Sequence, residues 1–486
     1  MLGKRAGAPH KGRTWQNVDR KAEMILKAAS AVKQTLIPIV RDGTPAARSA
    51  VAKLCGRLEA MEHLDSAPYR ARVKALFGKV LAPEAVVARI LQDVREKGDA
   101  ALLQYAQKID GVPLTPKTLR VSDAERRATS KSVSPALRAA LELAAERIAD
   151  YQKRLMPADI APRASKNGPP GVKSGLAWSP LRRAGVYVPG GTAAYPSSVL
   201  MNAIPAQVAG VAEIAIASPC GKDGSMSAGV LCACDILGIT EIYRLGGAQA
   251  IGALAFGTQS VKPVEKIVGP GNLFVMLAKR AVFGHVDIDM LAGPSEVLII
   301  ADDSARADFI AADLLAQAEH DALASCVLVT DSRVLADAVA LELTKQLATL
   351  PRRNIAEAAL RDWGLIVVTE GFAASIALAN QLAPEHLEVL TKDADAVSKK
   401  LNTAGAIFIG PYATEPLGDY MAGPSHTLPT GGTARAFSGL SVYSFLRRTS
   451  LIEADAKGLK ALSAAIATLA DAEGLEAHKR AVLIRG

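Results

Sequence analysis

Four short polar clusters hold the residues best suited to chemistry, and they contain four of the seven histidines. The clusters are Gln317 with His320, Glu385 with His386, Asp419 with His426, and Glu473 with His478. Their nitrogen and oxygen donors, without thiolates, suit zinc or a similar divalent ion that keeps open positions for a substrate. Imidazole moves protons near neutral pH, and a neighbouring carboxylate can be a second base. Together the clusters indicate metal-assisted acid–base chemistry.

Each cluster taken alone has a plainer structural explanation. Gln317 and His320 would share one face of a helix, where they could grip one ion or simply form a polar helix end. Glu385 and His386 follow a proline and could be a helix-start carboxylate beside a structural histidine. The last cluster could be a polar surface tail. Core packing does not explain the segment around Asp419, which is rich in glycine and proline.

The elements that would position these residues follow an alternating pattern from Ala184 onwards. Short β-branched runs are separated by helical patterns, and they fall into two successive sets. The runs are 184–188, 213–217, 241–245 and 266–268, then 296–300, 326–330, 365–368 and 406–409. Alternation of this kind is typical of parallel βαβ sheets. We therefore predict an α/β fold with two similar Rossmann-like parallel-sheet domains.

Glycine-rich turns stand beside several of these runs, at 189–192, 246–249, 269–272 and 293–295. Ligands of open α/β sheets lie outside the carboxyl ends of the strands, and glycine lets the backbone approach a phosphate. Ordinary turn chemistry would explain any single one. The four together favour a nucleotide or another phosphate-bearing ligand, although the chain has no G-x-G-x-x-G fingerprint.

Composition excludes several classes of protein. Of 486 residues, 50% are hydrophobic and 22% are charged, as in a globular enzyme with more than one domain. No apolar run is long enough to span a bilayer, and there is no signal-peptide pattern. We expect a cytoplasmic enzyme that binds no membrane, with a short organellar transit peptide in residues 1–18 as the alternative. The five cysteines form no C-x-x-C pair, so neither a disulfide framework nor a zinc–thiolate site is expected.

The formal charge of +9 lies entirely in the N-terminal part of the chain. Residues 1–75 hold 15 Lys or Arg against 6 Asp or Glu, so the remainder is balanced. The basic N-terminal stretch has no run of Lys or Arg with interleaved aromatics, and a nucleic-acid partner is not expected. Helical patterns are predicted over 17–39, 44–61, 84–98 and 134–155. The stretch 156–183, rich in Pro, Gly, Ser and Lys, is predicted to be a loop or linker.

The motifs in register resemble those of the histidinol dehydrogenase family, from about Ala85 to the C-terminus. The matching stretches are 186–192, 246–251, 269–272, 289–296, 317–320, 383–387, 418–420 and 477–479. The resemblance implies oxidation of L-histidinol through L-histidinal to L-histidine, the last steps of histidine biosynthesis. It also implies NAD as the oxidant, zinc at one ion per subunit, and a homodimer whose C-terminal segment crosses into the partner's active site.

The resemblance also implies roles for individual residues. The implied zinc ligands are Gln317, His320, Asp419 and His478. His386 would be the base that removes the alcohol proton, and Glu385 would assist attack of water on the aldehyde. The implied substrate contacts are Ser295, Gln317, His320, His386, Asp419, His426, Glu473 and His478. The implied NAD contacts are Tyr187, Gln249 and Asn272.

The expected organisation has four parts, with one discontinuous domain. They are a basic helical N-terminal extension at 1–80, a first α/β domain at 81–186 and 296–440, a second, NAD-binding α/β domain at 187–295, and a small C-terminal dimer-exchange segment at 441–486. The chain departs from the family pattern in the length of residues 1–80 and in Ser425, which stands where Asn is common.

Two other functions remain open from the sequence. A related zinc- and NAD-dependent branch oxidises other small polar alcohols, such as sulfonated diols. A binding protein built on a retired enzyme scaffold would be a non-enzymatic alternative. The presence of Glu473 and His478 favours histidinol over the first, and the complete ligand set argues against the second.

Overall fold

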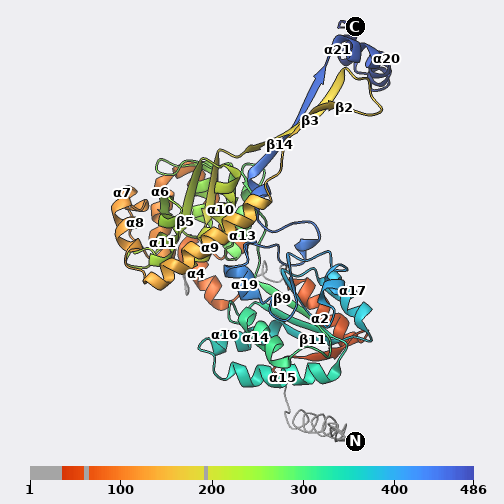
Figure 1. The fold of residues 1–486 in the computed structure, drawn as a ribbon. Coiled ribbons are helices and arrows are strands. Elements are labelled where there is room, and N and C mark those ends of the chain that lie inside the picture. The colour runs from red at the N-terminus through yellow and green to blue at the C-terminus, as the bar shows by residue number, and fades with distance from the viewer. Residues whose placement is uncertain (1–35, 58, 60–64, 191–194, 486) are drawn as a thin grey trace, which may run out of the picture. The chain divides into compact units, whose positions relative to one another are not determined.

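Two compact units make up the chain in the computed structural model, which describes residues 36–57, 59, 65–190 and 195–485 (Figure 1). The first unit is Met1–Arg70, Met290–Asp419 and Leu428–Gly439, and the second is Ala71–Asp289, Tyr420–Thr427 and Leu440–Gly486. Most of the helix predicted over 17–39 falls outside the described residues. In the described part of the chain, no helix has both the length and the apolar character required to span a bilayer.

The first unit is built on a six-stranded parallel sheet with the strand order β1-β11-β10-β9-β12-β13. The strands are β1 (Ile39–Arg41), β9 (Glu296–Ala301), β10 (Ser325–Thr330), β11 (Gly364–Val368), β12 (His386–Leu390) and β13 (Ala406–Ile409). Because side chains alternate along a strand, Val297 and Ile299 face one apolar layer while Leu298 and Ile300 face the other. Burial on both faces is why these strands read as continuous apolar runs.

Helices cover both faces of this sheet. On one face lie α14 (Ala307–Ala318), α15 (Arg333–Leu347) and α16 (Arg353–Trp363), and on the other α2 (Pro45–Cys55), α17 (Phe372–Leu382) and α18 (Ala394–Ser398). The helix predicted over 44–61 is present as α2, and its predicted cap is confirmed because Thr44 Oγ accepts the Ala47 N–H at 3.2 Å.

The second unit holds a five-stranded parallel sheet in the order β6-β5-β4-β7-β8. Its strands are β4 (Arg183–Tyr187), β5 (Glu213–Ser218), β6 (Glu241–Arg244), β7 (Lys266–Val268) and β8 (Asp287–Ile288). Three helices pack together and reach β4 and β7 through α12: α5 (Pro83–Lys97), α12 (Gly247–Phe256) and α13 (Leu273–Val282). Three more reach β4 and β5 through α10: α9 (Pro135–Arg154), α10 (Pro196–Ala209) and α11 (Ala228–Ile236). The prediction of two parallel-sheet domains is therefore confirmed.

An antiparallel arm in the second unit corrects the prediction of a loop over 156–183. The arm contains β2 (Ile160–Ala164), β3 (Val172–Pro180) and β14 (Leu446–Ala454), followed by α20 (Ala456–Ala472) and α21 (Glu476–Leu483). β3 and β14 pair over nine residues, which corresponds to about 30 Å of strand. The prediction failed because most of these strand residues are exposed or half-buried, so no apolar pattern marks them.

The domain boundaries also differ from those expected. Residues 81–186 belong with 187–289 and not with 296–440, because β4 is the middle strand of the second sheet and α5 packs on α12. The described part of 1–80 is not a separate extension, since β1 pairs with β11 and α2 packs on the first sheet. Residues 441–486 cluster with the second unit.

Candidate active site and metal centre

The end of α14 supplies the first polar cluster of the first unit. Gln317 is fully buried in the last turn, and His320 follows the C-cap with its N–H bonded to the Gln317 carbonyl at 3.2 Å. Once its amide nitrogen faces Glu415, Gln317 donates to both carboxylate oxygens of that residue, at 3.0 and 3.1 Å. The amide oxygen is then available as a ligand. Burial lowers the pKa of His320, which keeps the ring neutral and able to coordinate a metal.

The short helix α19 (Glu415–Tyr420) brings two carboxylates to the same place. Ligand atoms of His320, Glu415 and Asp419 all lie within 4.8 Å of one another. Glu415 and Asp419 are four residues apart, so they share one helix face. Burial raises the pKa of Glu415 to about 8. The sequence reasoning missed Glu415, although its spacing from Asp419 was a usable signal.

Glu385 and His386 lie at the amino end of β12. The chain enters this strand through Ala383, the one non-glycine residue with a positive φ (47°) among the described residues. This left-handed backbone is costly for alanine and turns the chain sharply after α17. Gly293–Ser295 likewise precedes β9, at the amino end of that strand. The polar pair therefore does not lie at the carboxyl edge, where ligand sites of open α/β sheets are expected.

His386 has the hydrogen-bonding pattern of a base. Its Nδ1 lies 3.0 Å from the carbonyl oxygen of Glu296, and a carbonyl can only accept, so Nδ1 carries the proton. Its buried Nε2 has no hydrogen-bond partner among the described residues and lies 3.7 Å from Asp419 Oδ1. Burial lowers the pKa of His386, but the carboxylates of Glu385, Glu415 and Asp419 more than offset this and raise it well above its usual value.

Glu385 is buried beside His386. Its Oε2 accepts the Glu296 N–H at 2.9 Å and lies 3.7 Å from His386 Nδ1. Burial raises the pKa of Glu385 to about 7; the nearby His386 opposes this shift and Glu296 adds to it. A carboxyl group with this pKa is partly ionised near neutral pH and can accept a proton from water.

A second buried carboxyl pair supports the cluster and was also missed. Glu388 lies two residues after His386 on β12, and its Oε1 accepts the Glu415 N–H at 2.9 Å. Burial raises the pKa of Asp313 to about 6 and, together with the carboxylates of Asp313 and Glu415, raises that of Glu388 well above its usual value. Glu388 thus connects β12 with α19, and its buried Oε2 has no hydrogen-bond partner among the described residues.

The residues expected to contact NAD lie at or beyond the carboxyl ends of strands in the second sheet. The buried Tyr187 hydroxyl accepts the Gly247 N–H at 3.1 Å, and burial raises its pKa to about 12. Gln249 donates to Asp110 at 3.1 Å, while its buried Oε1 has no partner among the described residues. Asn272 caps α13 by accepting two backbone N–H groups. Turns at this edge match the prediction; Gly191 and Thr192 of the first turn lie outside the described residues.

The remaining expected substrate residues are divided between the units. Ser295 belongs to the first unit. His426 belongs to the second unit, where its Nε2 lies 3.3 Å from Ser198 Oγ. Glu473 and His478 are exposed, near the end of the arm. Both residues belong to the second unit. Ser425, the departure from the family pattern, is buried and donates to the Met201 carbonyl at 3.0 Å.

The first unit thus gathers donors for a divalent metal next to a buried imidazole base, and the second carries glycine-rich turns at a Rossmann-like sheet edge. These features define a class of α/β enzymes that combine a metal-binding site with a nucleotide-binding sheet. A sequence model of the histidinol dehydrogenase family matches residues 79–486. The chain belongs to the histidinol dehydrogenase family.

Individual relatives agree with this assignment. The chain is 52% identical to the histidinol dehydrogenase of Moorella thermoacetica over 413 residues, which are 84% of this chain and 96% of the relative. It is 49% identical to that of Rhizobium meliloti over 401 residues, covering 82% and 91%. The crystal structure of histidinol dehydrogenase from Elizabethkingia anophelis is similar with a TM-score of 0.82 at 33% identity, covering 93% of this chain and 98% of that one.

Proposed function

We propose that this protein oxidises L-histidinol through L-histidinal to L-histidine with NAD as the oxidant, in the last steps of histidine biosynthesis. Family membership supports the reaction. The observation that carries the mechanism is the buried Nε2 of His386, which has no hydrogen bond among the described residues and lies 3.7 Å from Asp419 in the metal-ligating cluster. An alcohol held by that cluster would have its proton facing a base.

The donor set of the first unit suits zinc. Gln317, His320 and Asp419 would hold the ion with one amide oxygen, one imidazole nitrogen and one carboxylate oxygen, and the partner's His478 would complete the set. The neutral His320 ring and the available Gln317 oxygen fit this assignment. When bound, zinc would supply Lewis acidity and a fixed orientation for the alcohol. Glu415 would orient Gln317 through the bonds to its amide nitrogen.

Two residues would move the protons of the reaction. His386 Nε2 would take the hydroxyl proton while the carbinol hydride leaves for NAD, which gives the aldehyde. Glu385 would then take a proton from a water molecule that attacks the aldehyde carbon, which gives the singly deprotonated hydrate. Loss of a second hydride from that hydrate to a second NAD gives the acid. Ser295, His426 and Glu473 would hold the substrate, together with the metal ligands and His386.

Tyr187, Gln249 and Asn272 would contact NAD. Support comes from the orphaned Gln249 Oε1, a buried acceptor that a ribose hydroxyl or an amide of the cofactor could satisfy. The turn Gly246–Gly247 connects these two residues. The Tyr187 hydroxyl accepts the Gly247 N–H, and Gln249 lies in the first turn of α12, which begins at Gly247.

We also propose a homodimer in which the arm delivers Glu473 and His478 to the partner's active site. The arm exposes large apolar side chains, including Ile452, Leu469 and Ile484, with exposed fractions of 80%, 66% and 83%. Such side chains are normally covered, and a second copy of the chain would cover them.

The number of NADH molecules formed per histidinol, measured with and without metal, tests this function. Purified protein supplied with histidinol and excess NAD should form two NADH per histidinol, and removal of metal by a chelator should abolish the reaction until zinc is restored. One NADH per histidinol, or full activity in metal-free protein, would contradict the mechanism. Oxidation of a sulfonated diol in preference to histidinol would instead support the related branch.

A further inference from the structure

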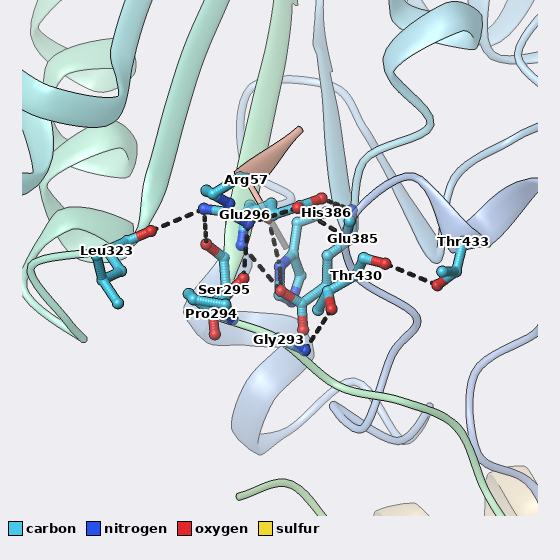
Figure 2. A network of polar contacts seen from close by, with 11 residues as sticks. Arg57, Gly293, Pro294, Ser295, Glu296, Leu323, Glu385, His386, Thr430 and Thr433 are labelled. Carbon is cyan, nitrogen blue, oxygen red and sulfur yellow. Dashed lines mark hydrogen bonds and ion pairs between the residues drawn. The ribbon is translucent and has the colours of Figure 1, made fainter. Parts of the chain in front are cut away.

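Arg57 is a fully buried arginine that follows α2, in a stretch that precedes the family match at residue 79. Its guanidinium donates through Nη1 to the carbonyl of Leu323 at 2.8 Å and to that of Ser295 at 3.4 Å. Through Nη2 it donates to the Pro294 carbonyl at 2.8 Å and pairs with Glu296 Oε1 at 2.5 Å. Figure 2 shows this guanidinium among the groups that it bonds.

Glu296 connects Arg57 to the two side chains proposed to move protons. Its backbone N–H donates to Glu385 Oε2 at 2.9 Å, and its carbonyl accepts from His386 Nδ1 at 3.0 Å (Figure 2). Its carboxylate accepts the Gly431 N–H at 2.8 Å and the Glu385 N–H at 3.3 Å. Both the backbone and the side chain of Glu296 therefore fix the position of the Glu385–His386 pair.

A planar guanidinium suits this place because its donors form a rigid fork. The fork satisfies three carbonyls of two separate loops and one buried carboxylate at once. A buried carboxylate without a cation is strongly disfavoured, and unpaired carbonyls add to the cost. Without Arg57, the turn Pro294–Ser295 and the Glu296 side chain would have to rearrange, and the backbone atoms that hold Glu385 and His386 would move with them.

We propose that Arg57 is a positioning residue for Glu385 and His386 that acts through Glu296. The expected change in kcat rests on the proposed function, whereas the expected change in the NMR signal of His386 does not. It brings a residue from outside the family match into the machinery of the active site. Arg57 itself touches neither the metal-ligating residues nor the reacting atoms.

Three variants of the full-length protein test this role. Arg57→Ala leaves a space that guanidinium can enter, and Arg57→Lys keeps the charge without the fork. Arg48→Ala is the control, because Arg48 lies on α2 and is exposed, and its guanidinium donates to the Gly43 carbonyl at 2.7 Å. The measurements are kcat and KM with histidinol and with histidinal, zinc affinity by competition with a chelator, and the downfield proton NMR signal of His386 Nδ1–H.

Positioning predicts that Arg57→Ala loses at least about tenfold in kcat with both substrates, because displacements below an ångström already cost rates of this order. KM and zinc affinity should change little, the His386 signal should shift or vanish, and millimolar guanidinium should restore part of kcat. Arg57→Lys should fall between the wild type and Arg57→Ala, and Arg48→Ala should match the wild type.

Unchanged kcat and an unchanged His386 signal in Arg57→Ala would overturn the proposal. If Arg57→Ala does not fold, Arg57→Lys decides: wild-type kcat and signal in folded Arg57→Lys would overturn it, and a lowered kcat with a shifted signal would support it. If the wild type does not oxidise histidinol, the proposed function fails, and the His386 signal alone decides whether Arg57 positions the ring.

Discussion

Replacing Glu385 by glutamine keeps the shape of a buried side chain and removes its charge. In the wild type, burial raises the pKa of Glu385 to about 7, against a usual value of 4.5. The side-chain oxygen of the introduced glutamine can still accept the Glu296 N–H, which Glu385 accepts at 2.9 Å. The substitution therefore separates the ionisation of this residue from its packing, and it should change both stability and catalysis in defined ways.

The stability effect has a definite sign. The folded state binds the Glu385 proton more tightly than the unfolded state, so this group's stabilising contribution is complete below about pH 4.5 and is lost as the pH rises through about 7. The difference between the two pKa values corresponds to about 3 kcal/mol. Metal-free Glu385→Gln should thus be more stable than metal-free wild type at pH 8, by up to about 3 kcal/mol, and nearly equal to it at pH 4.5. Urea unfolding at the two pH values measures this difference.

The catalytic effect falls on the second oxidation. Without a carboxylate to take a proton from water, histidinal oxidation should slow by about 10²- to 10⁴-fold, whereas histidinol oxidation depends on His386 and should continue. With an aldehyde trap present, Glu385→Gln should yield one NADH per histidinol. In the wild type, histidinal oxidation should fall as the pH drops and Glu385 becomes protonated, and this dependence should be absent from the residual rate of the variant.

Two results would refute this reasoning about Glu385. One is a Glu385→Gln variant that still gives two NADH per histidinol at the wild-type rate, because water activation would then lie elsewhere. The other is a stability gain that is the same at pH 4.5 and pH 8, since a packing change, and not a lost ionisation, would explain it. Glu357→Gln, a change at a half-buried residue on α16 outside the site, is the matched control.

Three further experiments test the rest of the site. Glu415→Gln should weaken zinc binding by about 10- to 100-fold in a chelator competition, because it replaces the carboxylate that orients Gln317; unchanged affinity would remove Glu415 from the site. Glu388→Ala should lower the free energy of unfolding by about 1–3 kcal/mol in urea titrations, whereas Glu388→Gln, which can still accept the Glu415 N–H, should lose much less. Mixing His386→Ala and His478→Ala chains should restore part of the activity if the partner's His478 acts at each site, and no recovery after subunit exchange would place His478 in its own chain's site.

The sequence predicted the parts of the fold that are buried on both faces. Strands such as Glu296–Ala301 read as strands because every residue in them is buried, and the helices between them keep apolar faces. The sheet to which β4 belongs could not be predicted, because strand order depends on contacts between distant residues and not on a local pattern. The arm strands gave no signal because their side chains are largely exposed.

The residues of the candidate site also divide into those that the sequence could predict and those that it could not. Gln317, His320 and Asp419 could be found because their residue types and motifs are distinctive, and the structure brings His320 and Asp419 together, with Gln317 bonded to Glu415 beside them. Glu415, near a helix start, had a signal in its spacing from Asp419, but Glu388 had none, since a glutamate on a strand usually faces water. Burial, together with nearby carboxylates, gives these two their raised pKa values. Arg57 was hidden for a related reason: an arginine after a surface helix has no feature that predicts a buried guanidinium.

The buried charges of the first unit explain why these supporting residues matter. Glu385, Glu388 and Glu415 are all buried with raised pKa values, and among the described residues none of these three pairs with a Lys or Arg, since Arg57 pairs with the neighbouring Glu296. Protons therefore offset part of the negative charge of the cluster in the metal-free protein. A divalent ion would favour the ionised carboxylates and release those protons. The cluster would then reach its catalytic protonation state, with Glu385 ionised and His386 able to accept a proton, only as the metal-ligating residues are engaged.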